Sequence, residues 1–79
     1  MIHKIRLIKI ISEALEVTDI DINSSMENTE EWDSLGHISI LVKLDKELDG
    51  RASGIEELGS ADSVSKIINA LIVSGDFIE

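Results

Sequence analysis

The sequence predicts an all-α domain, a small four-helix bundle made of three main helices and one short helix. Proline is absent, Trp32 and Phe77 are the only aromatic residues, and Ile, Leu and Val recur at spacings of three and four residues. Such spacing places apolar side chains on one face of a helix, whereas strands are usually richer in aromatic residues. A chain of 79 residues has room for one domain, 1–79, and one core.

The first helix is predicted over residues 2–16. One side of it carries Ile5, Ile8, Ile11 and Leu15, flanked by Leu7 and Ala14, and the opposite side carries Lys9, Glu13 and Glu16. This pattern is typical of an amphipathic helix that buries one face. We expect the Ile5 side to pack on the core.

Residues 17–33 are polar and lack sustained periodicity, which predicts a long loop. Loops of this length in small domains are often functional. Four apolar residues are expected to anchor the loop: Val17, Ile20, Ile22 and Met26. We interpret Trp32 as a further anchor packed on the bundle, with contact to a partner protein as the alternative.

The second helix is predicted over residues 34–48, with Asp33 or Ser34 as its N-cap and Gly50 near its end. At about 100° per residue its apolar positions fall into two strips, roughly 140° apart. The first strip contains Ile40, Leu41, Leu44 and Leu48, and the second contains Leu35, Ile38 and Val42. One strip suffices to dock the helix, so the second is either covered by neighbouring segments or presented to a partner.

A short helical turn and a last helix are predicted after Gly50. The turn covers residues 55–58, where Ser53 and Glu56 have the spacing of a capping box. The last helix covers residues 63–73, with Asp62 as its cap. Its apolar face is expected to carry Val64, Ile67, Ile68 and Leu71.

The net charge is −9, and eight acidic residues but no Lys or Arg lie between Glu13 and Asp33. Nucleic acids and anionic membranes bind through clustered Lys and Arg, so we expect neither as a partner. Proteins with basic surfaces are favoured as partners. An equal alternative is that the acidic residues serve only to keep the protein soluble.

Composition also argues against catalysis and metal binding. The chain has no cysteine, which excludes disulfides and thiolate metal sites, and no metal-ligand cluster or nucleophile–base pair is evident. We expect no enzyme activity and no metal. Without cysteines or a long apolar run, the protein is expected to be cytoplasmic.

Ser34 is the strongest candidate for a functional residue. Residues 31–35 lead directly into the second helix. A phosphodiester on a serine at this point would be stabilised by unpaired backbone N–H groups and the positive end of the helix dipole. The alternative is an ordinary N-cap serine.

Asp33-Ser34-Leu35, followed by an apolar-rich helix in a small acidic helical chain, resembles the acyl carrier protein family. The resemblance covers essentially the whole chain. It implies that Ser34 bears 4′-phosphopantetheine donated by coenzyme A, whose thiol carries an acyl or aminoacyl group as a thioester. Asp33 and Leu35 match the motif, and we assign partner recognition to Asp33, Leu35, Ile38 and Val42.

The implied partners are a phosphopantetheinyl transferase and the enzymes that load and transfer acyl or aminoacyl groups, acting on a monomer. Gly36 after the motif, and Lys43 and Lys46 in the helix, depart from the more acidic pattern of fatty-acid carriers. The run from Trp32 to His37 looks more like stand-alone carriers of specialised pathways, such as modified sugar, polyketide or aminoacyl assembly. The alternative function is a small acidic protein-interaction module without a prosthetic group.

Two residues after the motif leave alternatives open. Gly36 either gives close access to the arm or a partner, or is a tolerated glycine near a helix end. His37 either touches the arm, or is a solvated or packing residue, which is the better interpretation of a lone histidine.

Overall fold

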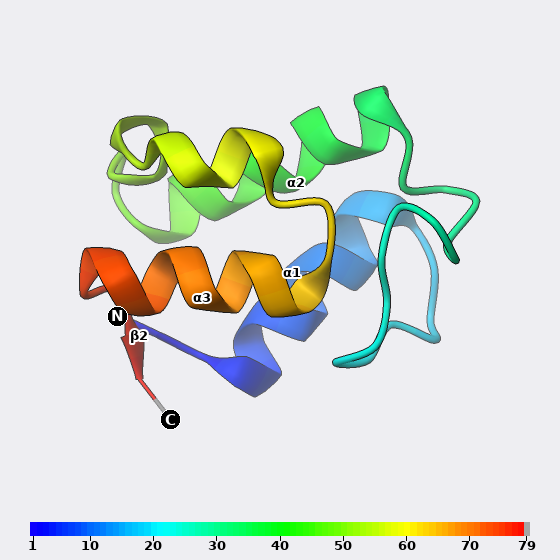
Figure 1. Ribbon diagram of the computed structural model, residues 1–79, viewed down its shortest axis with the longest axis horizontal. Helices are drawn as coiled ribbons and strands as arrows, with labels where there is room; N and C mark the ends of the chain where they lie inside the picture. The colour runs from blue at the N-terminus through cyan, green and yellow to red at the C-terminus, as the bar shows by residue number, and fades with distance from the viewer. Residues whose placement is uncertain (79) are drawn as a thin grey trace.

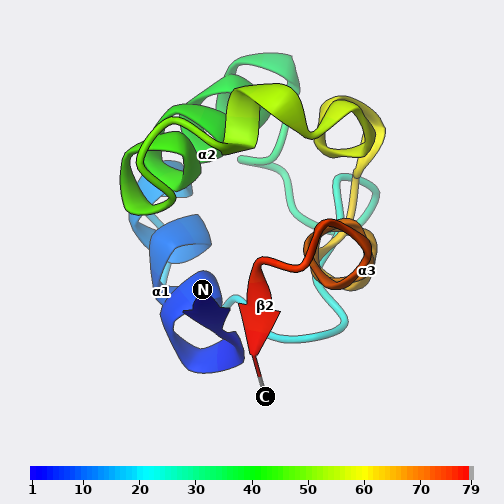
Figure 2. The same cartoon turned by 90° about the vertical axis from the view of Figure 1, so that its left-hand side faces the viewer.

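The computed structural model describes residues 1–78 and shows a mostly helical molecule. Most of it consists of three α-helices: α1 (Lys4–Leu15), α2 (Ser34–Glu47) and α3 (Val64–Ser74). Two short 3₁₀ segments, η1 (Ala52–Gly54) and η2 (Glu56–Ser60), precede α3. Figures 1 and 2 show these elements around a common interior, with α1 packed on α2.

A pair of two-residue strands, β1 (Ile2–His3) and β2 (Phe77–Ile78), departs from the all-α prediction. The strands are parallel, with Ile2 opposite Phe77, and the Ile2 N–H donates to the Asp76 carbonyl at 2.8 Å. Two residues are too few to show the alternation that reveals a strand. Because β1 occupies Ile2 and His3, the first helix begins at Lys4 and not at residue 2.

The buried face of α1 is rotated from the predicted one. It consists of Leu7, Ile10, Ile11 and Leu15. Ile5, predicted to pack on the core, is 81% exposed, and that prediction is wrong. The periodicity of α1 fits either neighbouring stripe, and the positions of α2 and α3 decide which one is covered.

The acidic loop between α1 and α2 is held at several points. Trp32 is fully buried, which confirms its predicted role as an anchor. Ile20 is buried as well, and Val17 and Met26 pack against the core, whereas Ile22 stays exposed. Backbone hydrogen bonds also tie the loop to the start of α3, from Met26 N–H to the Asp62 carbonyl at 2.9 Å and from Val64 N–H to the Ser24 carbonyl at 3.0 Å.

The predicted caps after Gly50 are wrong. Ser53 lies inside η1, where its hydroxyl donates to the Gly50 carbonyl at 3.0 Å, so it does not cap η2. Helix α3 is capped by Ser63, whose Oγ accepts the Lys66 N–H at 3.1 Å, and not by Asp62. Ser63 has the extended backbone that a cap requires directly before the first helical residue, and Asp62 forms an ion pair with Lys66.

The helices of the structure are short compared with a membrane-spanning helix. Over residues 1–78, no helix combines the length and the apolar character that crossing a bilayer requires.

Candidate functional site at the entrance of helix α2

Asp33, and not Ser34, is the N-cap of α2. The Asp33 carboxylate accepts the Gly36 N–H at 2.8 Å, and its backbone has the extended conformation of a cap. Ser34 is the first helical residue and is exposed. Its hydroxyl makes no hydrogen bond to any residue within 1–78, so it is free for chemistry or for a ligand.

The surroundings of Ser34 are acidic. Glu30, Glu31 and Asp33 are exposed on the loop that enters the helix. The helix N-terminus supplies a partial positive charge close to Ser34 itself. A partner that reaches Ser34 must therefore tolerate or complement several carboxylates, which favours a basic protein surface.

Gly36 allows the loop to pack against the first turn of α2. A Cβ atom at this position would collide with the Glu31 carbonyl oxygen and lie 2.8 Å from Leu15 Cδ2. From sequence, Gly36 was expected either to give close access to an arm or a partner, or to be a tolerated glycine near a helix end. The structure supports neither interpretation, because the space at Gly36 is filled by the protein's own loop and by α1.

His37 is a buried residue with two polar partners. Its Nδ1 accepts the indole N–H of Trp32 at 3.1 Å, and its Nε2 lies 2.9 Å from the Leu58 carbonyl oxygen. The imidazole and indole rings are nearly parallel, at an angle of 15°. His37 is thus a packing residue, one of the interpretations that the sequence favoured, although its hydrogen bonds depend on residues brought together only by the fold.

The two apolar strips of α2 have different environments. Ile40, Leu44 and Leu48 are buried and Leu41 is partly buried, so the first strip faces the core as predicted. Leu35, Ile38 and Val42 are 75%, 56% and 52% exposed. Residues 1–78 cover this second strip, which starts next to Ser34, only in part.

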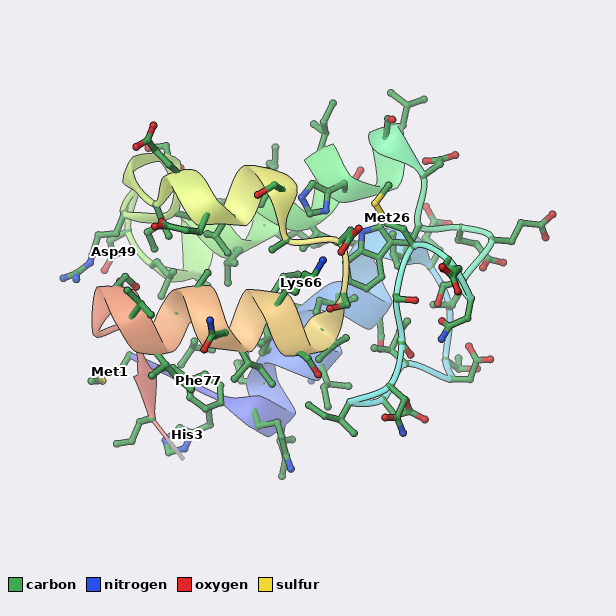
Figure 3. The ribbon with its side chains drawn as sticks, viewed as in Figure 1. Met1, His3, Met26, Asp49, Lys66 and Phe77 are labelled. Carbon is green, nitrogen blue, oxygen red and sulfur yellow. The ribbon has the colours of Figure 1, made fainter. Side chains whose placement is uncertain are left out.

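A hollow of about 470 Å³ lies beside Ser34. Its wall includes Met26 from the loop and Asp62 from the segment before α3, and Figure 3 shows Met26 near the start of α2. Lys66 donates a hydrogen bond to Asp62 over 3.0 Å and thereby lowers the pKa of this carboxyl group. Met26 and Asp62 were not predicted to lie near Ser34, because no local pattern in the sequence relates them to it.

A groove of about 490 Å³ lies next to this hollow, between α2 and the 3₁₀ segments. Ile38, Leu41 and Gly59 line both spaces. The rest of the groove is mainly apolar, with Val42 on one side and Ala52, Ile55 and Leu58 on the other. Ser34 therefore lines the first of two neighbouring hollows, and the second, mainly apolar one lies further along α2.

The site has neither a recognisable metal centre within residues 1–78 nor a counterpart among the known proteins compared with it. Among residues 1–78, no group of three or more His, Asp or Glu side chains is arranged to hold a metal ion. Comparisons with protein families, with curated proteins and with solved structures give no match. The geometry of the site itself is therefore the basis for its interpretation.

Proposed function

We propose that this protein is a carrier of the acyl carrier protein type, with Ser34 as the attachment point of 4′-phosphopantetheine. The observation that carries the proposal is the free, exposed hydroxyl of Ser34 on the first turn of a helix that Asp33 already caps. A serine needed for capping would have its oxygen occupied by a backbone N–H. The proposal also includes the four-helix carrier fold, with the 3₁₀ segments in the place of the short third helix.

The attachment reaction requires a nucleophilic hydroxyl and a separate enzyme. The Ser34 oxygen forms a bond to the phosphorus next to the pantetheine half of coenzyme A. The bond from that phosphorus to the adenosine bisphosphate leaving group breaks, and the hydroxyl proton passes to a base of the transferase. The resulting phosphodiester lies at the positive end of the helix dipole, which stabilises its negative charge.

The residues around Ser34 fit such a group. When attached, the arm supplies a thiol that carries an acyl or aminoacyl group as a thioester, in a chain that has no cysteine of its own. The hollow beside Ser34 leaves room along α2, and the groove beyond it offers an apolar wall. Leu35, Ile38 and Val42 then form the surface on which the transferase and the loading and transfer enzymes dock.

The finer assignments follow from the same proposal. We place the carrier in a specialised biosynthetic pathway of the cytoplasm, acting as a monomer and without catalysis of its own. Exposed carboxylates at Glu30, Glu31 and Asp33 favour partner enzymes with basic surfaces around their active sites.

The test is the intact mass of the protein after incubation with coenzyme A and a broad-specificity phosphopantetheinyl transferase. The wild type is expected to gain one phosphopantetheine, and Ser34→Ala to gain none. Ser39→Ala is the matched control, since Ser39 is an exposed serine of the same helix, and it should be modified like the wild type. Asp33 supplies the cap, so Ser34→Ala should change stability by less than about 0.5 kcal/mol.

The competing function, a protein-interaction module without a prosthetic group, rests on the exposed strip of Leu35, Ile38 and Val42 alone. In that case Ser34 stays unmodified by transferases that do modify a known carrier under the same conditions. The mass measurement thus separates the two functions.

A further inference from the structure

The imidazole of His37 joins three parts of the chain that surround Ser34. Trp32, on the loop before the helix, donates its indole N–H to Nδ1 at 3.1 Å. Nε2 lies 2.9 Å from the carbonyl oxygen of Leu58, in η2. His37 itself is on α2, one turn after Ser34. A single buried side chain therefore links the loop, the helix and the 3₁₀ segment.

Only one form of the imidazole satisfies both partners. An indole N–H can only donate and a carbonyl oxygen can only accept. Nδ1 must then carry the lone pair and Nε2 the proton, which is the neutral Nε2–H tautomer. In this form His37 is fully satisfied, and no buried side-chain nitrogen or oxygen within residues 1–78 lacks a partner.

The linked segments are the ones that form the walls of the hollow beside Ser34. His37 lines this hollow together with Met26 of the loop and with Gly59 and Ser60 of η2. The next side-chain bond between α2 and the 3₁₀ region is from Ser53 N–H to the Asp45 carboxylate at 3.0 Å. Asp45 lies about three turns along α2 from Ser34. The hydrogen bond between His37 and Leu58 is therefore the side-chain bond from α2 to the 3₁₀ region that lies near Ser34.

Building on the proposed function, we infer that His37 is a positioning residue for the modification of Ser34. By linking Trp32 and Leu58, it holds the loop and η2 at a set spacing on either side of the helix entrance. A modifying enzyme must contact these flanking segments in order to reach the Ser34 hydroxyl. Loss of the link therefore weakens recognition of the carrier more than it slows the chemical step.

Three variants separate the contribution of the two His37 hydrogen bonds from that of the space its side chain fills. His37→Gln keeps one acceptor and one donor at the tip of its side chain and can bridge the same two partners. His37→Leu keeps an apolar volume but removes both hydrogen bonds. Trp32→Phe keeps an aromatic ring at this position but removes the donated N–H and part of the buried indole volume. All three are compared after circular dichroism has confirmed their folding.

The first measurement is steady-state transfer of phosphopantetheine to each variant. Trp32→Phe, which loses one hydrogen bond, is expected to raise the KM for the carrier about five- to tenfold with kcat little changed. His37→Leu, which loses two, is expected to raise this KM by at least as much. His37→Gln is expected to restore KM to within about twofold of the wild type. If His37→Leu does not fold, Trp32→Phe and His37→Gln give the same comparison.

The second measurement is nuclear magnetic resonance of the unmodified chain, which needs no transferase. It should show the Nε2–H tautomer of His37, and an indole N–H of Trp32 that exchanges with solvent more slowly in the wild type than in His37→Leu. An Nδ1–H tautomer, or equal exchange in the two proteins, would overturn the link.

The kinetic outcomes distinguish this inference from the proposed function. A wild type that is modified, with an unchanged KM in folded His37→Leu and Trp32→Phe, overturns the role of His37 alone. A wild type that resists every transferase overturns the carrier function and, with it, any role of His37 toward Ser34.

Discussion

The two apolar strips of α2 belong to one helix but have opposite environments. Ile40 and Leu44 are fully buried against the core, whereas Leu35 and Ile38 remain more than half exposed a few residues away. Both strips have the same helical periodicity in the sequence. The difference shows that periodicity identifies apolar faces, while the neighbouring elements decide which face is covered. A strip left largely exposed beside an exposed serine then becomes a candidate docking surface.

The largest loss of stability is expected from shortening a side chain of the buried strip. Leu44→Ala should lower the free energy of unfolding by about 2 to 5 kcal/mol, because it leaves a cavity in a small core. Leu35→Ala makes the same chemical change on the exposed strip and should cost less than about 0.5 kcal/mol. Urea unfolding of both variants is the measurement. Similar losses in the two proteins would mean that the exposed strip is also structural.

A smaller loss is expected at the contact between α2 and its own loop. In Gly36→Ala the new methyl group meets the Glu31 carbonyl and Leu15, and such overpacking costs about 1 to 3 kcal/mol. Gly54→Ala is the matched control, because a Cβ atom there meets nothing within 4 Å. Thermal unfolding compares the two, and an equally stable Gly36→Ala would argue against close packing of the loop.

Ile38→Asp tests the exposed strip as a docking surface. Ile38 is 56% exposed, so we expect a change in stability below about 0.5 kcal/mol and slower modification of Ser34. Ile72→Asp is the control, since Ile72 on α3 is 53% exposed but does not line the hollow beside Ser34. It should leave the rate of modification unchanged. Melting of Ile38→Asp as severe as that of Leu44→Ala would make both strips part of the core.

The smallest change in stability is expected on removal of the ion pair between α1 and α2. Arg6 donates to Glu47 at 2.9 Å, and this hydrogen bond lowers the pKa of Glu47 below its ordinary value of 4.5. A lowered folded-state pKa stabilises the protein above pH 4.5, and the contribution is lost as the pH falls through the folded value. Stability should therefore fall slightly less on acidification in Glu47→Gln than in the wild type. Because both side chains are partly exposed, added salt should shrink this difference.

The local properties of the chain were predictable from sequence. The three main helices, the core-facing strip of α2 and the anchoring role of Trp32 follow from spacing and composition, because each depends on residues close together in the chain. Ser34 at the start of a helix was predictable for the same reason. Its attachment role remains a prediction that the mass measurement tests.

Tertiary structure decided what depends on residues far apart in sequence. The pairing of Ile2 with Phe77, the exposure of Ile5 and the link from His37 to Leu58 each require two distant segments to meet. A local pattern records the preferences of one segment but not which surface its neighbours cover. Burial and hydrogen-bond partners are properties of pairs of surfaces, so they are settled only when the helices pack.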